Sequence, residues 1–218
     1  MNASHSPAQA GTHTSGLVHN LAGIALVVML AALGIAYLVD LSGRSHGQQA
    51  PGIDDGNAIV QTVGGRELTI PENWFRYGEQ MQSGFVSQVD LSFTLPLGAV
   101  QVTLLPRSRA KTSSELLDSV YVHQFAKGTQ TGLPGLIGQK LEGNGYNGEV
   151  VWYDALAQKP FVAKCIAAIE AGAPNKCVRT VHLQTGLAAI FSFDDTMLPG
   201  WRDFDVEMAK WLDRIGAN

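Results

Sequence analysis

An uninterrupted apolar segment near the start of the chain constrains its architecture more than any other feature. Residues 21–39 (LAGIALVVMLAALGIAYLV) contain no charge, amide or proline. As a helix they would extend about 28 Å, close to the roughly 30 Å of a bilayer's hydrocarbon core. The sequence therefore predicts a transmembrane helix over residues 17–41 that contacts the lipid bilayer through residues 21–39, with Tyr37 at one membrane interface.

A cleaved secretory leader is the alternative interpretation of this segment. Such a leader normally begins with basic residues and has a shorter apolar core, of about 7 to 15 residues. Residues 1–20 contain no Lys or Arg, and the apolar run is nineteen residues long. The pattern therefore favours a retained anchor over a leader.

The segments on either side of the predicted helix are polar and have no apolar periodicity. Residues 1–16 are rich in Ser, Ala, Gly and His, which predicts a disordered tail. Residues 42–57 (SGRSHGQQAPGIDDGN) predict a flexible stalk. Residues 58–218 then suffice for one folded domain. The formal net charge is −4, so no nucleic-acid partner is predicted.

Alternation of apolar and polar residues predicts a domain rich in strands. Gly64-Gly65 separates the first two strand-like segments and predicts a hairpin. A second hairpin is predicted where VDLSFTLP (89–96) and AVQVTLL (99–105) alternate in the same way. Four later strands predict an antiparallel meander. These four are residues 148–156, 161–169, 177–185 and 187–193.

Two segments predict amphipathic helices. ELLDSVYVHQFAK (115–127) follows candidate N-cap residues, and the chain ends in WRDFDVEMAKWLDRIG (201–216), whose apolar residues fall on one face. The predicted fold class is therefore α+β. It consists of a single N-terminal transmembrane helix followed by one soluble domain, residues 58–218, with an antiparallel sheet covered by two helices.

The two cysteines indicate the compartment. Cys165 and Cys177 lie in strand-like segments joined by the turn-forming AGAPN (171–175). If these segments pair about a centre near Ala171, the cysteines face each other within disulfide range. A disulfide indicates an oxidising compartment. Two buried free thiols remain an alternative, as does a zinc site, for which only His182 is a nearby ligand.

The orientation in the membrane depends on this cysteine pair, because the charges near the apolar run do not decide it. Arg44 is the only Lys or Arg within about 15 residues of either end. The sequence therefore predicts a single-pass protein of the inner (cytoplasmic) membrane. Residues 1–20 are expected in the cytoplasm, and the C-terminal domain in the periplasm.

Several short motifs and their order resemble a known fold group. A strand runs into IPENW (70–74), a meander and one middle helix follow, and LPGW (198–201) precedes the final amphipathic helix. This arrangement resembles the Mog1/PsbP/DcrB-like α+β fold over about residues 58–216. The resemblance implies an accessory, binding or assembly factor without a catalytic site, and it assigns no functional residue.

Residues that often carry chemistry are present but scattered. GNGYNG (143–148) has the letters of a dinucleotide-binding loop, yet a strand follows it instead of a helix, so no nucleotide is predicted. His123 and His182 have no nucleophile or third ligand at a useful spacing. Asp194 and Asp195, with Asp203 and Asp205 beyond them, suit helix ends better than a Ca²⁺ loop. No catalytic residue, metal or cofactor is predicted.

Two functions follow as hypotheses. The first is a membrane-anchored extracytoplasmic (periplasmic) binding, accessory or assembly domain that acts through protein–protein contacts, with a membrane protein as its partner. The alternative is a membrane-tethered hydrolase or redox enzyme. Its pocket would use His123, His182 or the Asp194/Asp195 region.

Overall fold

The computed structural model describes most of the chain beyond residue 56. It covers residues 29–30, 57–95, 98–143, 145–146 and 148–218. The chain divides into two compact units, Met1–Gln49 and Ala50–Asn218. The second unit contains every described residue except Met29 and Leu30.

Three sequence predictions fall largely outside the described residues. These are the tail (1–16), the transmembrane helix (17–41) and the stalk (42–57), of which only Met29, Leu30 and Asn57 are described. Among the residues that the structure covers, no helix combines the length and the apolar character needed to cross a membrane.

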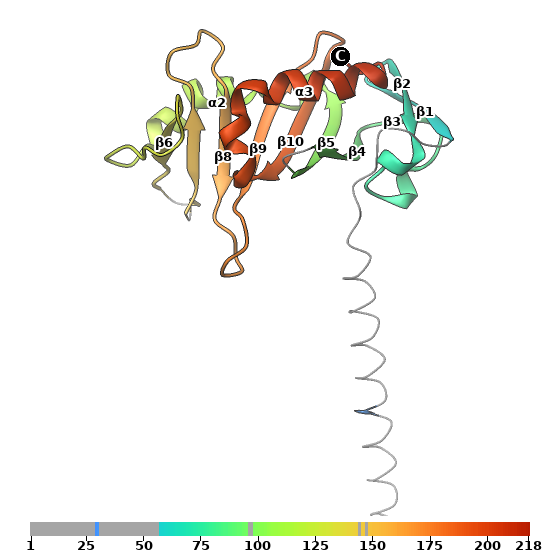
Figure 1. Ribbon diagram of the computed structural model, residues 1–218. Helices are drawn as coiled ribbons and strands as arrows, with labels where there is room; N and C mark the ends of the chain where they lie inside the picture. The colour runs from blue at the N-terminus through green and yellow to red at the C-terminus, as the bar shows by residue number, and fades with distance from the viewer. Residues whose placement is uncertain (1–28, 31–56, 96–97, 144, 147) are drawn as a thin grey trace, which may run out of the picture. The chain divides into compact units, whose positions relative to one another are not determined.

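A seven-stranded antiparallel sheet forms the centre of the domain (Figure 1). Its strand order is β4-β5-β10-β9-β8-β7-β6. Alternation explains the strands, because every second residue of β4 is buried while its neighbours are less so. The strands are β4 (Val89–Leu95), β5 (Gly98–Pro106), β6 (Ile137–Lys140), β7 (Val150–Tyr153), β8 (Val162–Ile166), β9 (Lys176–His182) and β10 (Leu187–Asp194).

A smaller sheet precedes it in the chain. Its order is β2-β1-β3, from β1 (Ala58–Val63), β2 (Arg66–Pro71) and β3 (Gly84–Val86). Gly64 and Gly65 join β1 to β2 with φ of 58° and 83°, values that a two-residue hairpin turn requires and that glycine adopts readily. β3 pairs with β1 in parallel.

The two α-helices pack on opposite faces of the large sheet. Helix α3 (Trp201–Arg214) crosses one face (Figure 1), and its buried residues Phe204 and Met208 share a core with Ala163 and Cys165 of β8. Helix α2 (Ser113–Ser119) contributes Leu117 to a second cluster. That cluster contains Val162, whose side chain points to the other face of β8.

A reciprocal capping box fixes the start of α2. Glu115 N–H donates to the Thr112 hydroxyl at 3.1 Å, and Thr112 N–H donates to the Glu115 carboxylate at 2.7 Å. The carboxylate accepts hydrogen bonds from both the N–H and the hydroxyl of Thr112, and these two bonds hold the pKa of Glu115 below its ordinary value. Short 3₁₀ helices complete the described structure at Glu72–Trp74, Gly78–Gln80, Arg107–Arg109, Tyr121–Gln124 and Asp195–Gly200.

The predicted fold class is wrong. The described residues form mostly sheet, with two sheets instead of one, and no described helix can span a membrane. The middle helix ends at Ser119 instead of residue 127, because Val120 leaves the helical region (φ −131°, ψ −60°). The β-branched and aromatic run from Val120 to Val122 disfavours helix.

Both edges of the large sheet are covered. At β4, Arg76 N–H donates to Asp90 O at 2.9 Å. At β6, Ala126 N–H donates to Lys140 O at 2.9 Å, and Gln130 pairs with Gly138. Covered edges do not invite an added strand. The edges of the large sheet are therefore poor sites for a strand added by a partner.

Candidate functional site

The hairpin between β8 and β9 projects beyond the body of the large sheet (Figure 1). Cys165 and Cys177 are direct partners in its antiparallel register, and a disulfide joins them with Cα atoms 3.9 Å apart. The disulfide predicted from the sequence is thus confirmed. It closes the base of a turn that contains residues 167–175.

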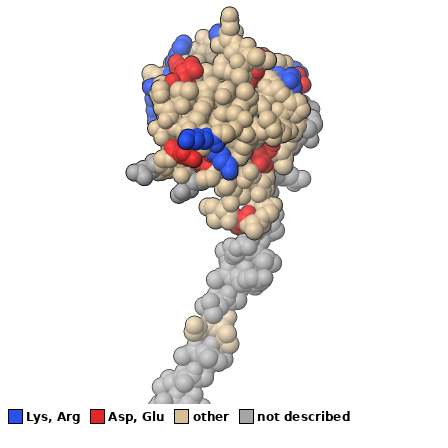
Figure 2. Space-filling model, turned by 90° about the vertical axis from the view of Figure 1, so that its left-hand side faces the viewer, with Lys and Arg blue, Asp and Glu red and all other residues tan. Residues whose placement is uncertain are grey.

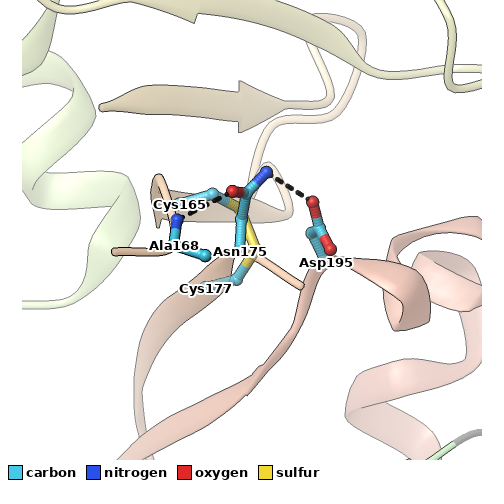
Figure 3. The surroundings of a disulfide bond; sticks show 5 residues. All are labelled: Cys165, Ala168, Asn175, Cys177 and Asp195. Atoms are coloured by element: carbon cyan, nitrogen blue, oxygen red, sulfur yellow. Dashed lines mark hydrogen bonds between the residues drawn. A yellow bond between two sulfur atoms is a disulfide. The ribbon is translucent and has the colours of Figure 1, made fainter. Parts of the chain in front are cut away.

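Asn175 holds this turn against the body of the domain (Figure 3). Its side-chain oxygen accepts a hydrogen bond from Ala168 N–H at 3.0 Å, and its amide nitrogen donates to the Asp195 carboxylate at 2.7 Å. Asp195 N–H in turn donates to Asn175 O at 2.9 Å. Beside these bonds, Lys176 pairs with Asp194. The two ends of the turn are therefore fixed by covalent, polar and ionic contacts.

The tip of the hairpin is apolar and exposed. The side chain of Ile169 is fully exposed, at 103% of its reference area, and Ile166 is 40% exposed. An open groove of about 390 Å³ runs along this part of the hairpin, and its apolar lining is Ile166, Ala167, Ala168, Ile169, Ala173 and Pro174. Exposed apolar surface on a rigid element commonly marks a protein contact.

A second hollow adjoins the disulfide at the base of the hairpin. Its volume is about 280 Å³, and Ala167 borders both it and the groove. Trp152 and Leu198 supply apolar walls, and Asp195 supplies a carboxylate. The groove and the hollow therefore meet at Ala167, at the base of the hairpin.

Charges elsewhere on this side of the domain are interspersed. Figure 2 shows Lys and Arg next to Asp and Glu around a broad uncharged area, with no continuous area of one sign on that face. On β8, Lys164 forms an ion pair with Glu149, and their charged atoms are 3.1 Å apart. Neighbouring opposite charges cancel at a distance, so this face has little long-range attraction for a highly charged partner.

A polar cleft of about 440 Å³ lies where β8 and β9 separate beyond their last paired residues. Ser113 of α2 enters the gap and accepts a hydrogen bond from Thr180 N–H at 2.8 Å. Arg179 donates to Val162 O at 3.1 Å and forms two bonds with the Asp205 carboxylate, at 2.8 and 2.5 Å. Within this cleft, Arg179 and Asp205 are therefore bound to each other, and Ser113 is bound to the backbone of β9.

The histidine candidates do not provide a free catalytic nitrogen in this cleft. His182 lies at its edge, with Nε2 2.8 Å from Ala110 O and Nδ1 3.4 Å from the Arg107 guanidinium. Since a carbonyl only accepts, Nε2 carries a proton, and Nδ1 accepts from Arg107. His123 is exposed on the 3₁₀ helix Tyr121–Gln124 and is not among the residues that line this cleft.

Asp194 and Asp195 lie apart from His182, whereas Asp205 lines the same polar cleft as His182, with its carboxylate bound by Arg179. Asp194 is six residues along β10 from Ala188, the partner of His182, or about 20 Å at the usual rise per residue. Asp194 and Asp195 are held by Lys176 and Asn175. Among the residues that the structure describes, no group of three or more His, Cys, Asp or Glu side chains is arranged to bind a metal ion.

Three residues that build this region were missed in the sequence. Asn175 ends the turn-forming segment AGAPN, and Ser113 precedes the predicted middle helix, so neither position alone indicates its partner. Arg179 carried a usable signal, because it alternates with Cys177 and Val181 on the buried face of β9. A buried cation at such a position predicts an acidic partner, here Asp205.

Comparisons with known proteins give one solved structure of similar fold. No family model and no curated protein matches the chain. A match with a TM-score of 0.51 and 10% sequence identity covers 77% of this chain and 98% of the other. That structure is Smlt3025, an immunity protein of the Stenotrophomonas maltophilia type IV secretion system. At this identity, the similarity shows a shared fold.

Proposed function

We propose that this chain is a binding protein that acts by direct contact with another protein, on the periplasmic side of the inner membrane. The observation that carries the proposal is the β8–β9 hairpin, whose exposed apolar tip is held rigidly at its base. Rigid exposed apolar elements suit protein recognition, because little conformational freedom is lost on binding. The disulfide supports the location, since such bonds persist in oxidising compartments.

The fold similarity suggests which kind of partner to test first. Smlt3025 is described as an immunity protein of a secretion system, and immunity proteins include members of the tightest known protein complexes. We extend this role to the present chain, with a secreted toxic protein as the partner. The resemblance to the Mog1/PsbP/DcrB-like fold stays a prediction, and it implies the same broad class of binding or accessory function.

Affinity purification tests the binding function. The tagged full chain, isolated in mild detergent from the cells that naturally make it, should elute with a second protein in a fixed ratio. Light scattering during size-exclusion chromatography gives the mass of that complex. Repeated isolation of the chain as a lone monomer, under conditions where known membrane complexes survive, argues against the proposal.

A competition experiment tests the immunity role separately. Cells that lack the gene should lose viability when mixed with their parent strain, and a plasmid copy of the gene should restore it. Equal survival of the mutant would leave a binding function but remove the immunity role.

The location has its own test. Alkaline phosphatase fused after Asn218 should be active, because that enzyme needs an oxidising compartment. Fluorescent GFP at the same site would instead place the domain in the cytoplasm.

A further inference from the structure

We infer that the β8–β9 tip, residues 166–174, is the docking surface of this chain. Its occupant is a partner protein with an apolar pocket for Ile169, bordered by a Lys or Arg that pairs with Glu170. The inference rests on the proposed function and deepens it, because it names the contact surface and the chemistry of the partner.

The tip is already ordered before any partner binds. The disulfide and the Asn175 bonds hold its two ends. Within the turn, Ala173 N–H donates to Glu170 O at 3.2 Å, and Pro174 restricts the following backbone. A surface ordered in this way loses little entropy on association, so a few good contacts suffice for affinity.

The side chains of the tip define the complementary surface. Ile169 is wholly exposed and is flanked by small residues, four alanines and a glycine between 167 and 173. Small neighbours let a partner approach closely enough to enclose the isoleucine. An enclosed apolar side chain at the centre of a contact is typical of the residues that dominate binding.

The charge of Glu170 also defines the complementary surface of the partner. Glu170 is exposed and forms no ion pair within the described part of the chain, and no Lys or Arg occurs from 166 to 175. Lys176, just beyond, already pairs with Asp194. In Figure 2 the lowest lobe of the domain, where the hairpin projects, is uncharged except for one small acidic area. A partner cation therefore meets an unneutralised carboxylate.

The same features favour a protein over a lipid surface. Membrane-binding segments combine apolar side chains with Lys or Arg and often with aromatic residues at the interface. The tip has a single acid and neither cations nor aromatic rings. An anionic bilayer would repel Glu170 instead of binding it.

Photo-cross-linking in living cells tests the surface directly. The probe is p-benzoylphenylalanine, incorporated in the full chain at position 169 or, as a matched control, at position 156. Leu156 is 95% exposed but lies in the loop between β7 and β8. We expect one discrete protein adduct from position 169 and none from 156, with the cross-linked peptide apolar and next to a Lys or Arg.

Two substitutions test the chemistry in the purified complex. Ile169→Ser and Glu170→Lys should each reduce the co-purified partner at least about tenfold, while Leu156→Ser retains it. All three substituted side chains are exposed, so the three variants should melt at the same temperature as the unmodified chain. Loss of the partner then cannot reflect unfolding.

The possible failures are distinguishable. An intact complex that is unaffected by Ile169→Ser, or that cross-links from 156 and not 169, overturns this docking surface and leaves the proposed function standing. An adduct of lipid mass at 169 also overturns it, in favour of a membrane contact. Absence of any complex with the unmodified chain rejects the proposed function and the docking surface together.

Discussion

Cys165 and Cys177 face each other across β8 and β9, and their disulfide is the only covalent link at the base of the exposed hairpin among the described residues. Cys165→Ser or Cys177→Ser should destabilise the fold, because the unfolded chain gains conformational entropy when the cross-link is absent. The expected loss is about 3 kcal/mol for this short loop. Thermal unfolding should therefore show a melting temperature lower by about 6 to 12 °C.

The double variant is the internal control for this prediction. Because one bond is lost in all three proteins, Cys165→Ser/Cys177→Ser should melt no lower than either single variant. Mass spectrometry after alkylation without reduction identifies the native state. Two alkylated thiols in protein from its native membrane would remove the bridge and the main support for an oxidising location.

Arg179 is buried and forms a fork-like pair with Asp205 on α3. Arg179→Lys should lower stability by about 2 kcal/mol, because one ammonium cannot reach both carboxylate oxygens and Val162 O together. Asp205→Asn should cost less, about 1 kcal/mol, since Asp205 is half exposed and water screens its charge.

Urea unfolding measures both variants and their combination. A coupling free energy near zero between the two substitutions would show that Arg179 and Asp205 do not depend on each other. The matched control is Lys210→Gln, which removes an exposed pair with Glu207 on the same helix and should change stability little.

Local patterns account for what the sequence predicted correctly. The cysteine pairing follows from hairpin symmetry, because opposite residues of an antiparallel pair have numbers with a constant sum. β4, β5, β9 and β10 follow from alternation within single segments. Helix α3 follows from an apolar face repeated over fourteen residues. Each of these signals lies within one segment or one hairpin.

Features that depend on distant parts of the chain were not predictable in this way. β6 lies in the glycine-rich stretch 128–148, whose composition disfavours strands, and pairing with β7 determines it. The bond from Asn175 to Asp195 exists because β9 and β10 pair in a particular register. Ser113 reaches Thr180 across 67 residues of sequence. Such contacts follow from the assembled sheet and not from local composition.

The hydroxyl of Ser113 occupies the gap between β8 and β9. Ser113→Ala should lower stability by about 1 to 3 kcal/mol, because it leaves the Thr180 N–H buried without an acceptor. Hydrogen exchange of the Thr180 amide, measured by NMR, should be faster in the Ser113→Ala variant than in the unmodified chain. Ser119→Ala is the control. Its hydroxyl bonds Glu115 O on an exposed helix surface, so its removal should be nearly neutral.

Asp90 on β4 is the clearest source of pH-dependent stability. Burial alone would raise the pKa of this carboxyl, but hydrogen bonds from Thr103, Gln80 and Gln88, with the charge of Arg76, outweigh it and lower the pKa below the ordinary value. The Gln80 bond is 2.9 Å and the Gln88 bond 3.3 Å. The folded state therefore favours the ionised form more than the unfolded state does.

The sign of the effect follows from linkage. A group whose pKa is lower in the folded state stabilises the fold above its unfolded pKa, about 3.9 for Asp, and that stabilisation is lost as the pH falls through the lower folded value. Asp90→Asn should therefore lower stability by about 1 kcal/mol at pH 7, because its amide NH₂ cannot accept from Gln80 or Gln88. The difference in stability between Asp90→Asn and the unmodified chain should shrink steadily below about pH 4.

Melting temperatures from pH 7 down to pH 2 measure this convergence. Asp118→Asn is the control, because Asp118 is exposed on α2 and its carboxylate makes no hydrogen bond or ion pair in the described structure. Its curve should run parallel to that of the unmodified chain. A gap for Asp90→Asn that stays constant, or widens, as the pH falls below 4 would show that the Asp90 network stabilises through packing and not through its ionised carboxylate.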